Sequence, residues 1–251
     1  MTRSRLFPRP DQVAELTRGL RLPLPGLADA HLDVIFESIL CSWRQLVEHH
    51  GHELLNKDEN ELNSLLQIHL NGSRLHNDLL AQMVACVVRG GESVSFDGTH
   101  IEKRPDLAFY LTGRHASFPL LHASFPLLME CKIIDQSSGR SIDLYCAQGL
   151  RRFVDGEYAW GNMETVMVAY VHDRSSIEEN LIPHLVGLAA NPPDTMRTVS
   201  MPQRRPSIRS PTSVSQHDRV FRYVNSSGNN EPGVISIWHL WMNAPIANSL
   251  G

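Results

Sequence analysis

Two apolar stretches decide the fold: Pro105-Asp106-Leu107-Ala108-Phe109-Tyr110-Leu111, and further on Pro126-Leu127-Leu128-Met129-Glu130-Cys131-Lys132-Ile133-Ile134. Both are typical of buried strands. Because side chains alternate between the two faces of a strand, Glu130 and Lys132 are predicted to share one face. An acid and a base inside an apolar run are costly to bury without a partner. A divalent metal held by Asp106 and Glu130 would offset that cost.

The composition is that of an ordinary globular protein. The chain has 251 residues, of which 42% are hydrophobic and 20% charged, with a formal net charge of −4. No run approaches the ~18 apolar residues that span a bilayer, and the first residues lack the apolar stretch of a signal peptide. We therefore expect a cytoplasmic protein without a membrane partner. Four cysteines without paired spacing are predicted to be free thiols, namely Cys41, Cys86, Cys131 and Cys146.

Helical periodicity dominates the N-terminal third. Residues 28–50 are predicted to form a helix that Gly51 ends, within an N-terminal helical segment over residues 1–52 packed on the core. Asp58 is predicted to cap a helix through about Leu70, ended by Asn71-Gly72. The apolar spacing over residues 75–88 predicts a further helix.

Asp97-Gly98 lies between alternating stretches and predicts a hairpin that leads to Pro105-Asp106. The heptad HASFPLL at residues 115–121 is repeated without change at residues 122–128. We interpret this as a duplication tolerated by a loop, with the second copy feeding the Glu130 strand.

The remaining chain alternates between helices and strands. Ser141 is predicted to cap a helix, and residues 191–218, rich in Pro, Ser and Arg without periodicity, are expected to form a long loop or a disordered insert. The other predicted elements are a strand at 166–171, a helix at 177–188 and two final strands at 220–224 and 234–242.

Over residues 53–172 this order of elements resembles the PD-(D/E)xK nuclease superfamily, which has the restriction-endonuclease-like fold. The resemblance implies an α/β fold with a central mixed β-sheet flanked by helices, and one nuclease domain over residues 53–251. In that family a helix acid precedes the strand that begins with the catalytic Asp, and the next strand carries Glu-x-Lys. Asp106, Glu130 and Lys132 match this pattern.

The matching residues suit phosphodiester hydrolysis. Mg²⁺ prefers oxygen ligands and keeps several waters, so Asp106, Glu130 and the Cys131 carbonyl would suffice; Mn²⁺ is expected to substitute. Such a metal activates water and neutralises phosphate charge. Lys132, between two carboxylates, is expected to have a raised pKa and to orient the water.

The helix acid of the family corresponds to Glu59 or Glu61, and helical-wheel geometry does not choose between them. We prefer Glu59, while both could be helix-start charges favoured by the helix dipole. Gln148 resembles a polar residue that some family members place beside the metal, although a surface glutamine is an equal alternative.

Basic residues flank the predicted site despite the negative net charge. Lys103, Arg104, Arg151 and Arg152 are candidates for binding a nucleic-acid backbone. For any one of them a solvated surface role is an equal alternative.

These expectations favour a Mg²⁺-dependent endodeoxyribonuclease that cleaves DNA. Fold-level analogy extends this to prokaryotic genome defence or restriction, with a homo-oligomer or a defence-system protein as further partners. Two alternatives stay open. One is an RNA-cleaving toxin or effector with the same site, and the other is a nucleic-acid-binding scaffold without catalysis.

Overall fold

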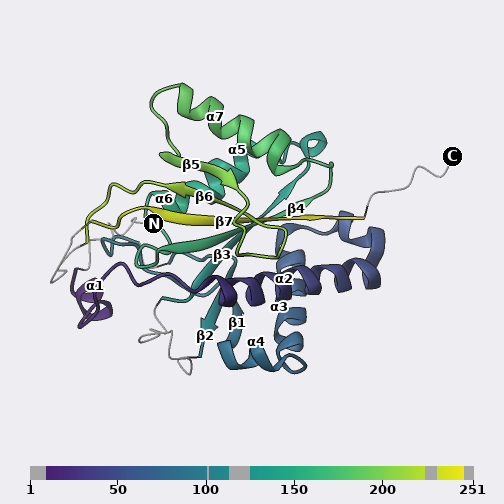
Figure 1. Cartoon of the computed structure of the whole chain (residues 1–251), viewed down its shortest axis with the longest axis horizontal. Coiled ribbons are helices and arrows are strands. Elements are labelled where there is room, and N and C mark those ends of the chain that lie inside the picture. Colours follow the sequence, from purple (N-terminus) through teal and green to yellow (C-terminus); the bar gives the residue numbers. More distant parts are fainter. Residues whose placement is uncertain (1–9, 101, 113–124, 224–230, 246–251) are drawn as a thin grey trace, which may run out of the picture.

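A computed structural model describes residues 10–100, 102–112, 125–223 and 231–245. Its centre is a seven-stranded mixed sheet with the strand order β1-β2-β3-β4-β7-β6-β5. The middle strands β3, β4 and β7 are parallel, and each flanking pair is antiparallel. Helices lie on both sides of the sheet (Figure 1). The predicted α/β class, with a mixed sheet flanked by helices, is confirmed.

The strands are β1 Val84–Arg89, β2 Leu107–Leu111, β3 Leu127–Ile134, β4 Glu164–Val171, β5 Thr198–Gln203, β6 Ser213–His217 and β7 Ile235–Asn243. The α-helices are α1 Pro10–Leu16, α2 Asp29–His50, α3 Glu59–Arg74, α4 Asp78–Met83, α5 Ile142–Tyr145, α6 Arg151–Val154 and α7 Ile182–Ala190. Short 3-10 helices are η1 Gly51–Asn56 and η2 Gln136–Ser138, and π-helical turns are η3 Cys146–Leu150 and η4 Ile177–Leu181.

Two apolar layers sandwich the sheet. Helices α2, α3 and α4 pack on one face, against Met129, Cys131 and Ile133 of β3. The segments α5–α6 and η4–α7 pack on the other face, which carries Leu128 and Ile134. Every residue of β4 is buried, as expected for a central strand covered on both sides. The alternation of β3 therefore places Glu130 and Lys132 on one face, as predicted, and this face is the one covered by α5–α6.

The helix predicted over residues 75–88 is wrong in its second half. Only the six-residue α4 is helical there, and the chain then enters β1. Val87 pairs with Phe109 of β2, so sheet pairing of β-branched residues overrides the helical spacing. Asn71 does not end α3. Its amide donates to the Val87 carbonyl at 2.8 Å and its oxygen accepts from the Val87 N–H at 3.0 Å, which covers the outer edge of β1.

The long loop predicted for residues 191–218 is also wrong. This segment forms β5 and β6 and extends the sheet beyond β7. Ile208 is buried in the α2–α3 layer and Met196 in the opposite one. Ion pairs with α2 hold the segment, at 2.7 Å for Arg205–Asp29 and 2.9 Å for Arg209–Asp33. The strand predicted at residues 220–224 is absent from its described part, residues 220–223.

Several other sequence predictions hold, although, in the described part of the chain, the Ser141 side chain makes no capping hydrogen bond at the start of α5. Helix α2 matches residues 28–50, strand β4 and the segment η4–α7 lie where expected, and Asp58 caps α3. Among the described residues, the hairpin predicted before Asp106 contains one β-bridge, between Ser93 and Lys103, and a hydrogen bond from the Ser95 N–H to the His100 carbonyl at 2.8 Å. All four cysteines are free thiols.

The tandem heptad is only partly visible. Its first copy lies outside the described residues. In the second copy, Phe125 is the fourth of the seven residues and packs edge-on against Trp160, and the last two residues begin β3.

No helix in the described ranges is long and apolar enough to cross a membrane.

Candidate active site

The site forms where β2 and β3 part. Their pairing stops at Leu107 and Met129, whereas β3 continues beside β4 on its other edge. On the side that β2 has left, the Cys131 N–H donates to Asp106 Oδ2 at 2.8 Å and the Ile133 N–H donates to Glu59 Oε2 at 3.3 Å. Two carboxylates thus replace the missing strand as hydrogen-bond acceptors, and they gather beside Glu130 and Lys132.

Lys132 is the centre of the cluster. Its ammonium lies 3.0 Å from Glu59 Oε1, 3.0 Å from Glu130 Oε1 and 3.8 Å from Asp106 Oδ2. It also donates to the Cys131 carbonyl at 2.8 Å. Burial opposes the charge, but the attraction of the three carboxylates outweighs it and raises the pKa of Lys132, as predicted. Lys132 is therefore protonated at neutral pH and acts as a fixed hydrogen-bond donor.

Glu130 is the most deeply buried carboxylate of the cluster, with 1% of its surface exposed. Its Oε1 accepts from Lys132 and also from Arg152 Nη1 at 2.8 Å. Its Oε2 is buried and has no hydrogen-bond partner within the described part of the chain. Burial, reinforced by the charge of Asp106, raises the pKa of Glu130 to about 7.

Arg152 approaches Glu130 from the helical segment after β3. Its Nη1 also donates to the Tyr158 hydroxyl at 3.0 Å, and its guanidinium lies 5.6 Å from the centre of that ring. Tyr158 in turn donates to the Arg104 carbonyl at 3.2 Å. The sequence indicated Arg152 as a phosphate-binding residue but gave no sign of its contact with Glu130.

A π-helical turn brings this segment close to β3. A Cβ atom added to Gly149 would lie 2.5 Å from Met167 Cε and 3.7 Å from Glu130 Cγ, so only glycine fits without displacing Met167. Turns of this kind shift the phase of a helix and recur at functional sites. Gln148, in the same turn, is exposed, and no hydrogen bond from its side chain to the cluster is present among the described residues.

The two acidic residues at the start of α3 have different surroundings. Glu59 reaches Lys132 and β3, and burial raises its pKa against the opposing charge of Lys132. Glu61 turns back to Asp58, accepting from its N–H at 2.9 Å and completing a capping box. The structure thus brings Glu59, the preferred helix acid, into the cluster; its part in catalysis stays a prediction.

The other predicted basic residues are paired with carboxylates. Lys103 contacts Glu157 at 2.8 Å, and Arg104 contacts Glu92 at 2.6 Å. Arg151 pairs with Asp155 at 3.0 Å. For any of these three, binding a nucleic-acid backbone requires exchanging a carboxylate for a phosphate.

The residues of the cluster fit a magnesium ion by their donor chemistry. Asp106, Glu130 and the Cys131 carbonyl all offer oxygen ligands. Oε2 of Glu130 is buried without a hydrogen-bond partner among the described residues, and a cation there would offset the cost of burying it. Across the described ranges, no three His, Cys, Asp or Glu side chains are already placed around one metal position. A metal at this place would have two carboxylates and one carbonyl as protein ligands, because Glu59 is paired with Lys132 at 3.0 Å.

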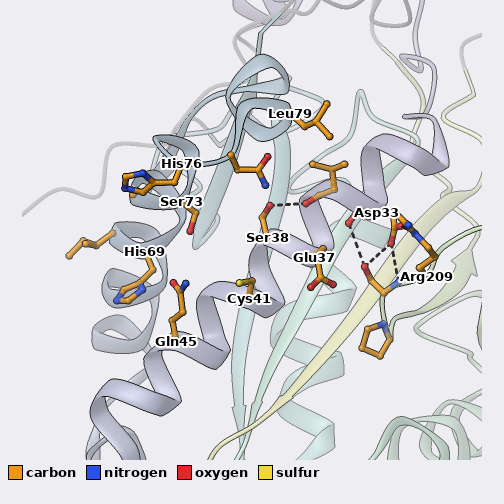
Figure 2. A pocket seen from close by; sticks show the side chains of 16 residues that line it. Asp33, Glu37, Ser38, Cys41, Gln45, His69, Ser73, His76, Leu79 and Arg209 are labelled. Atoms are coloured by element: carbon orange, nitrogen blue, oxygen red, sulfur yellow. Dashed lines mark hydrogen bonds and ion pairs between the residues drawn. The ribbon is translucent and has the colours of Figure 1, made fainter.

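A separate hollow of about 900 Å³ lies between α2 and the C-terminal half of α3 (Figure 2). Asp33 and Arg209 close one end, and His69 and His76 lie at the other. It contains none of the cluster residues, because Glu59 stands at the opposite end of α3. The hollow and the candidate active site are therefore different places on the molecule.

The candidate active site consists of three carboxylates and two cations: Glu59, Asp106, Glu130, Lys132 and Arg152. They come from α3, from the residue before β2, from β3 and from α6, so the fold and not the local sequence brings them together. Comparisons of this chain with protein-family models, with curated proteins and with solved structures find no match.

Proposed function

We propose that this protein is a metal-dependent nuclease with a restriction-endonuclease-like core that hydrolyses DNA phosphodiester bonds. The observation that carries the proposal is the convergence of Glu59, Asp106 and Glu130 on Lys132 at the point where β2 leaves β3. The motif order indicates Asp106, Glu130 and Lys132 from the sequence, with Glu59 or Glu61 as the helix acid. Their resemblance to the nuclease superfamily extends the proposal to a role in prokaryotic genome defence.

The chemistry divides among the residues of the cluster. Asp106, Glu130 and the Cys131 carbonyl would hold Mg²⁺, which when bound lowers the pKa of water and neutralises phosphate charge. Lys132 stays protonated and donates hydrogen bonds to the attacking water or to a phosphate oxygen. Glu59 holds the ammonium of Lys132 in position through a 3.0 Å contact.

Cleavage of plasmid DNA, single-stranded DNA and RNA, each with Mg²⁺ and with Mn²⁺, tests the proposal. We expect DNA cleavage that EDTA abolishes and that Asp106→Asn and Glu130→Gln each lose. These variants keep the shape of the side chain and remove its charge, so thermal unfolding should show that they remain folded.

The other outcomes are equally informative. Cleavage of RNA alone would assign the site to an RNA-cleaving effector. Binding of nucleic acid without cleavage would indicate a scaffold. Wild-type rates in Glu130→Gln would show that the cluster is not the active site.

A further inference from the structure

The guanidinium of Arg152 is anchored along one side only. Both of its hydrogen bonds, to Glu130 and to Tyr158, leave from Nη1. No hydrogen bond from Nε or Nη2 is present within the described residues, and 36% of the Arg152 side chain is exposed, against 2% for Glu130. The inner end of the group is therefore fixed to the cluster, while its remaining donors are accessible.

Those remaining donors suit one kind of ligand. A guanidinium offers a planar pair of N–H groups that matches two oxygens of a phosphate. The neighbouring Arg151 is already paired with Asp155, and Lys103 and Arg104 with Glu157 and Glu92.

The net charge of the cluster also favours a phosphate as the ligand of Arg152. Glu59, Asp106 and Glu130 carry three negative charges when ionised, and Lys132 and Arg152 carry two positive ones, which leaves the cluster at −1. One divalent ion changes this to +1, and one phosphodiester then brings it to zero. Without Arg152 the loaded cluster would already be neutral and would attract a phosphate less strongly.

We propose that Arg152 binds the phosphodiester that is cleaved, with Tyr158 and Glu130 holding the inner end of its guanidinium and its free donors facing the phosphate. This inference rests on the proposed nuclease function and adds the residue that recognises the reacting phosphate. The alternative is that Arg152 serves only as the counter-ion of Glu130.

Two binding measurements separate these roles. DNA affinity is measured by fluorescence anisotropy with Ca²⁺ in place of Mg²⁺, and gel analysis of the same samples verifies that the DNA stays intact. Mn²⁺ affinity is measured by calorimetry without DNA. The variants are Arg152→Gln, Arg152→Lys and Tyr158→Phe. The control is Arg44→Gln, because Arg44 is an exposed arginine of α2 that pairs with Glu37 at 2.6 Å and has no part in the cluster.

We expect Arg152→Gln to weaken DNA binding by about 10- to 100-fold, the usual effect of losing a charged hydrogen bond. The slope of log DNA affinity against log salt concentration should be smaller for this variant by about one released counter-ion. Mn²⁺ affinity should stay within about threefold or tighten, because a cation near the metal is removed. Arg44→Gln should change either affinity by less than about fivefold, as for an exposed ion pair. Arg152→Lys should recover only part of the DNA affinity, and Tyr158→Phe should lose less than Arg152→Gln.

Four results would overturn the inference. Wild-type DNA affinity in Arg152→Gln would remove Arg152 from the phosphate site. A parallel loss of Mn²⁺ binding would show that Arg152 acts through Glu130. Equal binding by Arg152→Lys and wild type would exclude the two-donor contact. A wild-type protein that binds neither DNA nor Mn²⁺ would instead refute the nuclease function itself, and this inference with it.

Discussion

At the residue scale, the carboxylate of Glu59 makes two hydrogen bonds, one with each oxygen. One oxygen accepts from the Lys132 ammonium, and the other accepts from the backbone N–H of Ile133. The carboxylate of Glu61, two residues later, accepts a hydrogen bond from the Asp58 N–H within the capping box. Two acids of similar position in the sequence therefore have separate effects that substitution can distinguish.

We predict that Glu59→Gln reduces metal-dependent cleavage by about 10- to 100-fold, because the Lys132 ammonium that Glu59 positions would move away from the reacting water or phosphate. Glu61→Gln should leave activity unchanged, because glutamine also completes a capping box. Cleavage rates titrated against Mg²⁺ and Mn²⁺ for both variants check this. A selective loss in Glu61→Gln would transfer the role to that residue.

Lys132→Arg should be inactive although it keeps the charge. The Lys132 side chain is 13% exposed and its single nitrogen reaches two carboxylates and the Cys131 carbonyl within 3.0 Å. A planar guanidinium cannot converge on these acceptors from one atom and adds volume at a packed position, at about 1–3 kcal/mol. Single-turnover cleavage and thermal unfolding measure the two effects separately. Normal rates in Lys132→Arg would mean that only the charge matters.

At the element scale, the segment that contains β5 and β6 is attached to α2 by buried polar contacts. Asp33 accepts from the Ser210 N–H at 2.9 Å, from the Ser210 hydroxyl at 2.7 Å and from Arg209 at 2.9 Å. Its side chain is 8% exposed, whereas that of Asp29, which pairs with Arg205, is 32% exposed. Because Asp33 is the more buried of the two, its contacts should contribute more to the free energy of unfolding than those of Asp29.

Asp33→Ala should therefore destabilise the fold by about 1–3 kcal/mol, because it leaves buried donors of Ser210 without an acceptor. Asp29→Ala should cost less than about 1 kcal/mol, as for a more exposed pair. Urea unfolding of both variants provides the comparison. Equal losses would show that burial does not set the strength of these attachments.

The sequence predicts features that depend on local patterns and misses those that depend on contacts between distant elements. Asp106, Glu130 and Lys132 were predictable because strand alternation and motif order are local signals. The contact of Arg152 with Glu130 was not, because it spans 22 residues and passes through a π-helical turn. Strands β5 and β6 were missed because the connection between them is held by Asp29 and Asp33, 176 residues earlier in the chain. Contacts of that separation leave no local periodicity.

At the scale of the whole molecule, a buried polar chain joins the late strands to α5. Ser215 is hydrogen-bonded to both His217 and His239 at 2.7 Å, and the second ring nitrogen of His239 meets the Tyr145 hydroxyl at 2.8 Å. Burial lowers the pKa of His217 to about 4 and that of His239 to about 3. Both imidazoles are therefore neutral in the folded protein.

These histidines should make the fold sensitive to acid. Below pH 6.5 the unfolded chain binds protons that the folded chain cannot bind until pH about 4, so stability falls as pH falls through this window. Each histidine contributes a slope approaching about 1.4 kcal/mol per pH unit. The raised pKa of Glu130 has the opposite effect, since the folded state then binds the extra proton.

The difference between wild type and His239→Gln isolates the histidine from these other groups. Glutamine keeps a donor and an acceptor and does not titrate. We expect the free energy of unfolding of the variant to vary less steeply between pH 6.5 and pH 4.5, as measured by urea unfolding. Parallel curves would show that His239 takes up its proton without unfolding.

The parting of β2 from β3 also gives the site its own spectroscopic probes. The amide protons of Cys131 and Ile133 are held by Asp106 and Glu59 instead of by a neighbouring strand. Their exchange with deuterium and their nitrogen-15 shifts therefore measure how firmly each carboxylate is held, one amide for each acid. When Mg²⁺ is added without substrate, changes in the signals of these two amides would show whether Asp106 and Glu59 keep their hydrogen bonds to β3.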